Sequence, residues 1–468
     1  MVNLFLCTGA RLNLGDATHS AKRTAKNSRR SALSSMSCTI YHLLPPGEGN
    51  GFSGLTLVKI REVAHLEAEQ LKIAMLSVHS SPTGELGAID TGGMSVYVRE
   101  VAKELGDSGH LVDIYTRLTG SRQNQIADLY DNVRLIHLQA GGNGQMNKLA
   151  LYAHLDEFFN ELEAFRNRRS LDYDLIHSHY WLSGRVGSWA QERWEVPHVF
   201  MFHTVGAVKN STAGSEKEPE LRMAVEKHLA RKCDRILVAT DRERDHLVQH
   251  YGASPQTIGV VPCGVNLDLF RPLDKAAARQ QLGFSQDESI VLYVGRFAPV
   301  KGIDRLMEAI AYLQQHQGLR LVIVGGDGDG APEHQRFQSL ARKLSIQDSV
   351  TFMGRIEQDD LPPYYSAADV VVVPSHYESF GLVALESLAS GTPVVATKVG
   401  AMESILREGE TGHVVNNGSP RSLAKGIEKF ISSSNGPSPH KVRASVFRFS
   451  WANVASAIID EYRAVLGL

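Results

Sequence analysis

Short apolar runs alternate with segments of helical spacing over most of the chain. Runs without polar alternation are typical of strands buried on both faces of a parallel sheet. They fall into two sets, separated by a pause in the pattern at 266–272. The predicted strands are 71–78, 109–116, 174–178, 197–202, 234–240 and 259–262 in the first set, and 290–295, 319–325, 350–352, 370–375 and 393–397 in the second. The pattern predicts an α/β protein with two Rossmann-like domains, each with its own parallel sheet, facing across a cleft.

These boundaries divide the chain into four parts. Residues 1–70 form a basic, serine-rich extension and linker, residues 71–267 the first Rossmann-like domain, residues 268–450 the second, and residues 451–468 a C-terminal helix. The first 40 residues contain six basic residues and one acidic residue, with no long apolar core. A transit peptide can have this composition, but we favour a disordered tail or an over-extended start, with Met36 as an internal candidate.

Composition narrows the classes of function. Of the 468 residues, 43% are hydrophobic and 21% are charged, and the formal net charge is −2. No overall field therefore attracts nucleic acid or an anionic membrane, and no apolar run reaches the length of a membrane span. The four cysteines have neither paired nor metal-like spacing, so we expect free thiols in a cytoplasmic protein.

The segment 376–386 carries two carboxylates around the start of a predicted helix, directly after the strand 370–375. Ligands of open parallel sheets bind beyond the carboxyl ends of the strands, and a helix N-terminus there favours an anion. Glu378 and Glu386 would instead accept hydrogen bonds from hydroxyl groups. A ligand with both phosphate and hydroxyl groups, such as a nucleotide sugar, fits this combination. The alternative is a surface loop with two solvated glutamates.

Two cations, Arg296 and Lys301, follow the strand 290–295 and precede a helix. Arginine matches phosphate bidentately and lysine adds a point charge. The pair would hold a diphosphate and stabilise it as a leaving group, although solvated loop cations are the simpler alternative. Nearby, Asp327 and Asp329 have a spacing that holds a metal–nucleotide in other proteins, but we interpret them as part of a metal-free turn near the nucleotide.

In the first half, Gly92 and Gly93 lie where a strand gives way to a helix. Glycines there let backbone N–H groups approach a phosphate. The Gly-x-Gly-x-x-Gly fingerprint does not join the first strand to this helix, which argues against a nicotinamide oxidoreductase. His203 ends a strand and could contact a sugar or assist proton transfer, though a buried histidine is more often simply packed. Four further side chains could together bind an anionic acceptor: Lys148, Tyr180, Thr204 and Arg222.

Together, the Gly92-Gly93 loop, the cations Arg296 and Lys301, and the spacing of Glu378 and Glu386 resemble the GT-B retaining glycosyltransferases, the family of sucrose and sucrose-phosphate synthases. The resemblance spans residues 71–468. It implies sugar transfer from a nucleotide donor by a same-face attack, with no protein nucleophile, cofactor or catalytic metal. It also implies a C-terminal helix that crosses back to the first half.

The resemblance implies a role for each candidate residue. Those expected in catalysis are His203, Arg296, Lys301 and Glu378. The donor would be bound by Gly92, Gly93, Arg296, Lys301, Arg355, Ile356, Glu378, Phe380, Gly381, Leu382 and Glu386, with the diphosphate on the two cations, the sugar on Glu378, the ribose on Glu386 and the base on the backbone at 355–356. The acceptor would be bound by Gly93, Ser95, Lys148, Tyr180, Thr204 and Arg222.

Two branches of this family share further motifs with the chain. The segments 90–93 and 151–158 resemble the sucrose-type enzymes. The segments 179–184 and 202–210 resemble the mycothiol-pathway enzyme, whose acceptor is an inositol phosphate and which usually has Asn at the position of Ser95. We predict synthesis of sucrose 6-phosphate from UDP-glucose and fructose 6-phosphate, with a separate phosphatase acting on the product. The alternatives are transfer to an inositol phosphate, use of free fructose, and a nucleotide-sugar sensor without activity.

Overall fold

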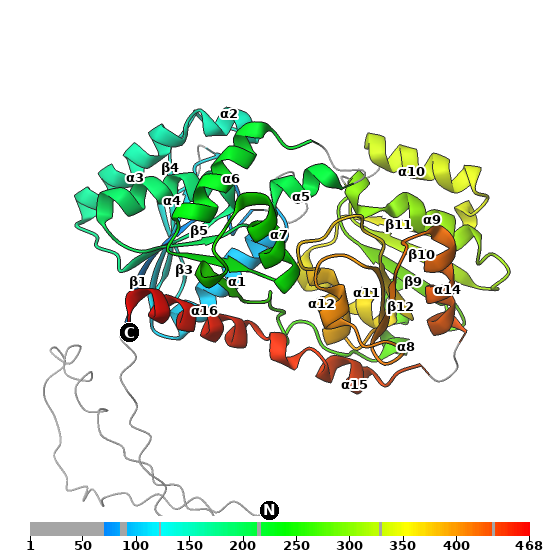
Figure 1. The fold of residues 1–468 in the computed structure, drawn as a ribbon. Coiled ribbons are helices and arrows are strands. Elements are labelled where there is room, and N and C mark those ends of the chain that lie inside the picture. Colours follow the sequence, from blue (N-terminus) through cyan, green and yellow to red (C-terminus); the bar gives the residue numbers. More distant parts are fainter. Residues whose placement is uncertain (1–69, 85–90, 121–122, 213–216, 327–329, 433–435) are drawn as a thin grey trace, which may run out of the picture. The chain divides into compact units, whose positions relative to one another are not determined.

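The computed structural model describes residues 70–84, 91–120, 123–212, 217–326, 330–432 and 436–468. The predictions for the N-terminal extension, Asp90, Asp327 and Asp329 fall outside these residues. Within them, the two predicted sheets are present and separate, so the expectation of two Rossmann-like halves is confirmed (Figure 1).

The first half is built on an eight-stranded sheet in the order β3-β4-β2-β1-β5-β6-β7-β8. All neighbours pair in parallel except β3 and β4, which are antiparallel. The strands are β1 (Lys72–Leu76), β2 (Leu111–Arg117), β3 (Ile126–Tyr130), β4 (Val133–Leu138), β5 (Leu175–His179), β6 (His198–Met201), β7 (Arg235–Val238) and β8 (Ile258–Val260). The helices are α1 (Gly93–Asp107), α2 (Lys148–Tyr152), α3 (Leu155–Arg169), α4 (Tyr180–Trp194), α5 (Gly206–Ser211), α6 (Glu220–Lys232) and α7 (Asp241–Tyr251).

The second half is built on a six-stranded parallel sheet in the order β11-β10-β9-β12-β13-β14. The strands are β9 (Ser289–Val294), β10 (Leu319–Val324), β11 (Val350–Gly354), β12 (Val370–Val373), β13 (Val394–Thr397) and β14 (Gly412–Val415). The helices are α8 (Lys275–Leu282), α9 (Ile303–Ala311), α10 (Pro332–Lys343), α11 (Pro362–Ala367), α12 (Leu382–Ala389), α13 (Met402–Ile405), α14 (Pro420–Ile431) and α15 (Pro439–Ala444). The C-terminal helix α16 (Trp451–Leu466) follows them.

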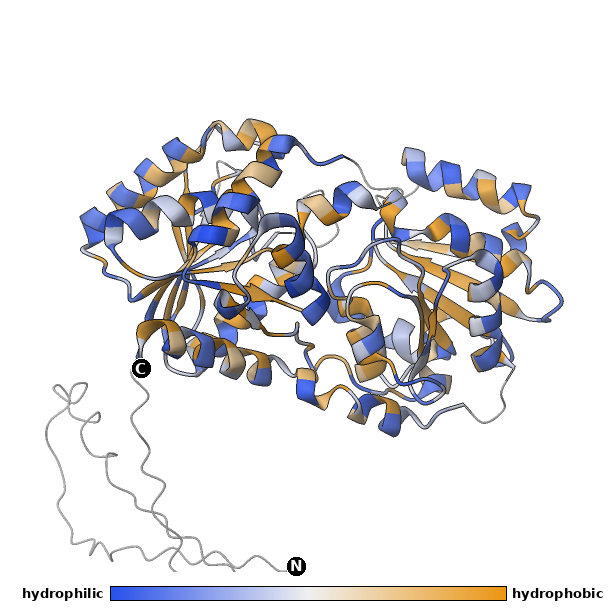
Figure 2. Ribbon diagram, in the orientation of Figure 1, coloured by the Kyte–Doolittle hydropathy of each residue, from blue (hydrophilic) through white to orange (hydrophobic). Residues whose placement is uncertain are grey.

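The apolar strands form the core of each half. Figure 2 shows the strands of both sheets as largely hydrophobic, whereas the helices carry mixed surfaces. The β12 run Val370–Val373 is fully or almost fully buried, as expected of a central parallel strand. The C-terminal helix α16 packs against α1 of the first half, with Ile458 and Tyr462 buried. Within the described residues, no helix combines the length and apolar character needed to cross a membrane.

Three strands were not predicted. The hairpin of β3 and β4 lies at the edge of the first sheet, and it turns at Asn132, which has a positive φ of 63°. Only part of β3 is apolar, because an edge strand buries less of its surface. The strand β14 lies at one edge of the second sheet. It has only four residues, too few to show a clear periodic pattern.

Candidate active site

The two predicted loop–helix junctions of the separate halves lie in contact. The helix α1 begins at Gly93 after β1, and α12 begins at Leu382 after β12. A Cβ atom built on Gly93 would lie 3.2 Å from Leu382 Cδ1, which is tighter than ordinary packing. Gly93 therefore brings its backbone against the start of α12 because it has no side chain. The structure joins the predicted donor and acceptor motifs at one place.

Gly92 precedes α1 with an extended φ of −176°, a value that any residue can adopt. A Cβ atom there would meet no neighbour within 4 Å. Backbone strain and packing therefore do not require glycine at this position. A glycine here does keep side-chain atoms away from the first N–H groups of α1, which no capping side chain engages.

The start of α12 is shaped by Gly381, whose φ is +116°. A Cβ atom on Gly381 would overlap the Met402 methyl group, so both conformation and space require glycine. The preceding residue, Phe380, is buried in the core and anchors the turn. No side chain caps α12, so its first N–H groups remain suited to an anion.

Lys301 and Glu378, which were predicted to bind different parts of the donor, form an ion pair. Lys301 Nζ donates to Glu378 Oε1 at 2.7 Å, and Ser375 Oγ donates to the same oxygen at 2.7 Å. The two side chains are 23% and 14% exposed. Arg296, at the end of β9, is exposed, and its carbonyl accepts from the Tyr293 hydroxyl. Burial and the charge of Glu378 raise the pKa of Tyr293, and the charge of Arg296 opposes this shift.

Glu386 is more enclosed than the prediction of a ribose ligand suggested. It is 8% exposed, and it accepts from Gln358 Nε2 at 3.0 Å and from the Tyr365 hydroxyl at 2.7 Å. Burial raises its pKa, while the two hydrogen bonds act in the opposite direction. Gln358 Oε1 in turn accepts from Arg99 of α1 at 2.8 Å. Glu386 thus belongs to a hydrogen-bonded chain that links the two halves.

The predicted base-binding residues, Arg355 and Ile356, lie in the loop after β11. Arg355 is partly exposed and lies 3.6 Å from Glu357, and Ile356 packs against the main core cluster. The same loop leads to Gln358, the partner of Glu386. This loop therefore joins the predicted base-binding and ribose-binding residues of the second half.

His203 follows β6 with a positive φ of 59°, a conformation that is uncommon outside glycine and frequent at functional sites. Its Nε2 pairs with Nδ1 of His179 at 3.0 Å, and the surrounding protein lowers the pKa of His203 to about 3. The ring of His177 lies 4.2 Å from that of His179, and its Nδ1 pairs with the Tyr462 hydroxyl of α16 at 2.6 Å. A neutral His203 can donate or accept a hydrogen bond but carries no charge at neutral pH.

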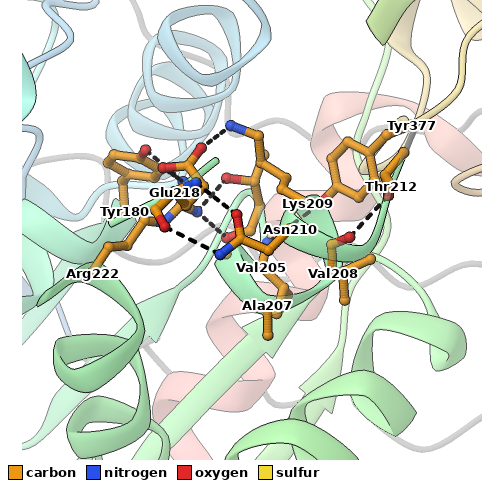
Figure 3. Close-up of polar contacts among 12 residues, drawn as sticks. Tyr180, Val205, Ala207, Val208, Lys209, Asn210, Thr212, Glu218, Arg222 and Tyr377 are labelled. Atoms are coloured by element: carbon orange, nitrogen blue, oxygen red, sulfur yellow. Dashed lines mark hydrogen bonds and ion pairs between the residues drawn. The ribbon is translucent and has the colours of Figure 1, made fainter. Parts of the chain in front are cut away.

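Tyr180, Thr204 and Arg222 of the predicted acceptor site lie together, but Arg222 differs from expectation. Its side chain has no exposed surface. Its Nε donates to Glu226 at 2.6 Å. Its Nη1 contacts the Tyr180 hydroxyl and Glu218, both at 2.9 Å (Figure 3). Its Nη2 contacts the Thr204 carbonyl at 2.9 Å and hydroxyl at 2.8 Å. These contacts and the one to Glu226 equal the five N–H groups of a guanidinium, so any anion that binds Arg222 would have to displace one of them.

His79, which the sequence did not single out, lies beside Tyr180 of the predicted acceptor site. The two rings are 4.6 Å apart, with an interplanar angle of 32°. Burial lowers its pKa well below the ordinary value, and the charges of Lys148, His203 and Arg222 add to this. His79 follows β1 at the carboxyl edge of the sheet, the same positional signal that pointed to Gly93. Ser95 is buried, and its hydroxyl pairs with Ser80 at 2.7 Å.

Two charged residues beside Arg222 were also missed. Lys209 of α5 and Glu218, which precedes α6, form an ion pair with each other, and Glu218 pairs with Arg222 as well. In the sequence, both belong to a stretch of mixed charges with no periodic pattern. Only the return of the chain at α6 brings them together.

Comparison with known proteins is consistent across both halves. Residues 91–269 match "Glycosyltransferase Family 4" and residues 274–445 match "Glycosyl transferases group 1". The D-inositol 3-phosphate glycosyltransferase of Acidothermus cellulolyticus is 41% identical over 407 residues, which are 84% of this chain and 90% of that protein. D-inositol 3-phosphate glycosyltransferase 2 of Catenulispora acidiphila is 38% identical over 413 residues, 85% of this chain and 96% of that protein. The structure of sucrose-phosphate synthase from Thermosynechococcus elongatus matches with a TM-score of 0.76 at 34% identity, covering 85% of this chain and 100% of that one.

Proposed function

The chain belongs to the retaining group 1 glycosyltransferases of family 4 and has their GT-B fold, and from this premise we propose that it transfers a hexosyl group from a nucleotide sugar to an inositol phosphate. The cationic cluster at the carboxyl edge of the first sheet carries the proposal. Arg222 contacts Tyr180 and Thr204 there, and Lys209 pairs with the same carboxylate as Arg222. Such a concentration of cations suits a phosphorylated acceptor rather than a neutral sugar.

The choice of acceptor rests on the relatives. The sequence relatives named above are D-inositol 3-phosphate glycosyltransferases, which favours an inositol phosphate over our initial prediction of fructose 6-phosphate. The likeness to a sucrose-phosphate synthase structure keeps fructose 6-phosphate as the second candidate. Both acceptors present a phosphate group to the same cations, so the proposal predicts that free inositol and free fructose react poorly.

The donor would bind against the second half. Its diphosphate would contact Arg296, Lys301 and the first N–H groups of α12, which stabilise the charge that develops as the bond to the sugar breaks. The acceptor hydroxyl oxygen would form the new bond to the anomeric carbon on the same face, and its proton would pass to the departing phosphate oxygen. Glu378, held by Lys301 and Ser375, would accept hydrogen bonds from sugar hydroxyls. Neutral His203 would hydrogen-bond the transferred sugar.

A panel of substrates tests this proposal. Purified protein is assayed with UDP-glucose, UDP-N-acetylglucosamine, ADP-glucose and GDP-glucose against inositol 3-phosphate, fructose 6-phosphate, free inositol and free fructose, with release of the nucleoside diphosphate as the readout. We expect transfer to inositol 3-phosphate and little to the neutral acceptors. Transfer to fructose 6-phosphate alone would restore the sucrose-phosphate prediction. Donor binding without transfer to any acceptor would instead support a nucleotide-sugar sensor.

A further inference from the structure

The Glu218 carboxylate contacts Arg222, one of the predicted acceptor-phosphate residues. Lys209 Nζ contacts its Oε1, and Arg222 Nη1 lies 2.9 Å from its Oε2. Figure 3 shows Lys209 of α5 and Arg222 of α6 reaching this carboxylate, with Tyr180 beside Arg222. Burial alone would raise the pKa of Glu218, but Arg222 and Lys209 outweigh it and hold the pKa below the ordinary value. The carboxylate is therefore an anion at neutral pH.

Glu218 is also the more exposed member of its pair with Arg222. The Glu218 side chain is 13% exposed, whereas that of Arg222 is fully buried. The other four contacts of Arg222 hold its guanidinium to Glu226, Tyr180 and Thr204. These partners belong to α6 itself or follow the ends of β5 and β6, so they fix the orientation of Arg222 whether or not Glu218 is present. The contact with Glu218 is the one that a solvent-borne anion could replace.

The backbone of Glu218 is held independently of its side chain. The Glu218 N–H donates to Asn210 Oδ1 at 2.6 Å, and Asn210 Nδ2 donates to the Glu218 carbonyl at 3.1 Å. This pair of hydrogen bonds ties the segment to α5. Rotation of the Glu218 side chain away from the cations therefore leaves the local chain path in place. The carboxylate can be exchanged for another anion without unfolding the segment.

We propose that Glu218 is an internal counter-anion that occupies the acceptor-phosphate position and must be displaced by the phosphate, so that it sets the affinity of the site for phosphorylated acceptors. This inference rests on the proposed function. A phosphate monoester carries a charge of about −1.5 to −2 at pH 7 and three acceptor oxygens, so it competes well with a single carboxylate. An unphosphorylated acceptor brings no anion to this position and leaves Glu218 on its two cations. The displacement therefore affects only phosphorylated acceptors.

The test compares Glu218→Gln with wild type, using inorganic phosphate as the probe and calorimetric titration of the full chain at pH 7.5. Removing the competing charge should tighten phosphate binding about 10- to 100-fold, the equivalent of one charge-assisted hydrogen bond. Glu220→Gln is the matched control, because Glu220 lies two residues away at the exposed start of α6. The phosphate affinity of this variant should equal that of wild type. Glu218→Ala is a second variant, since it retains the backbone bonds to Asn210.

Steady-state kinetics give a second readout. In Glu218→Gln, the KM for the phosphorylated acceptor should fall while the KM for its unphosphorylated form stays unchanged. Equal or weaker phosphate binding by both folded Glu218 variants would overturn the inference and assign Glu218 to acceptor binding or to structure. Tighter phosphate binding without sugar transfer to any acceptor would leave the counter-anion standing and reject the proposed function instead.

Discussion

Replacing Lys301 by methionine separates its two possible roles. The side chain keeps its approximate length but loses the charge that pairs with Glu378 at 2.7 Å. One role is to orient Glu378, which also accepts a hydrogen bond from Ser375. The other is to neutralise the diphosphate as it departs. The two roles predict different responses to a second substitution.

The expected magnitudes follow from burial and charge. The pair is only partly exposed, so losing it should lower the free energy of unfolding by about 1–2 kcal/mol, between the values for surface and buried pairs. Losing one preorganised cation from developing charge should lower kcat about 10²- to 10³-fold, or about 3–4 kcal/mol of transition-state stabilisation. If Lys301 acts only through Glu378, the double variant with Glu378→Gln should be no slower than the slower of the two single variants. If Lys301 contacts the diphosphate independently, the two losses should add and the double variant should be slower than either single one.

The assay measures kcat with the best substrates of the panel, and urea unfolding reports stability. Lys398→Met is the matched control, because Lys398 pairs with Glu403 at the same 2.7 Å while both side chains are 45% exposed. The free energy of unfolding of Lys398→Met should fall by less than about 1 kcal/mol, and its kcat should equal that of wild type. A kcat of Lys301→Met within about threefold of wild type would remove Lys301 from the leaving-group site and refute the reasoning.

Three further substitutions test other parts of the molecule. Gly381→Ala forces a side chain onto Met402 at a φ of +116°, so it should destabilise by about 1–3 kcal/mol and weaken donor binding, measured by urea unfolding and nucleotide titration. Tyr365→Phe removes a hydrogen bond to buried Glu386 and should lower the free energy of unfolding by about 1.5–3 kcal/mol, whereas an unchanged value would place that carboxylate in water. Burial raises the pKa of Glu243 from 4.5 to about 7, so the folded state binds more protons and wild-type stability should fall by up to about 3 kcal/mol as the pH rises from 4.5 to 7. Glu243→Gln should lose that part of the slope in unfolding titrations, and an identical slope would contradict the shift.

The sequence was informative wherever burial imposes a pattern. The strands β9, β10 and β12 are runs of branched residues because both faces of a parallel sheet are covered, and their positions were predicted closely. The hairpin of β3 and β4 was missed because pairing at a sheet edge depends on a partner strand rather than on a continuous apolar run.

Side-chain partnerships were not predictable in the same way. Sequence motifs brought Arg222 and Tyr180 into one candidate site, but they did not indicate that every N–H group of that arginine already has a protein partner. Such contacts depend on where separate loops meet at the ends of strands, and no local periodicity encodes them. His79 was missed for the same reason. Its ring lies beside that of Tyr180, which follows a different strand of the sheet.

Glu378 and Glu218 both pair with cations of the candidate site, but different additional hydrogen bonds hold them in place. Glu378 accepts hydrogen bonds from both Ser375 and Lys301, and these fix its position. It could therefore hydrogen-bond a sugar hydroxyl while it stays paired with Lys301. Glu218 contacts the two cations that an acceptor phosphate would need, while its backbone is secured by Asn210. The same change from glutamate to glutamine should therefore have opposite consequences. At position 378 it should slow transfer, and at position 218 it should tighten binding of the phosphorylated acceptor. If both variants transfer sugar more slowly and bind the phosphorylated acceptor no more tightly than wild type, the role assigned to Glu218 is wrong.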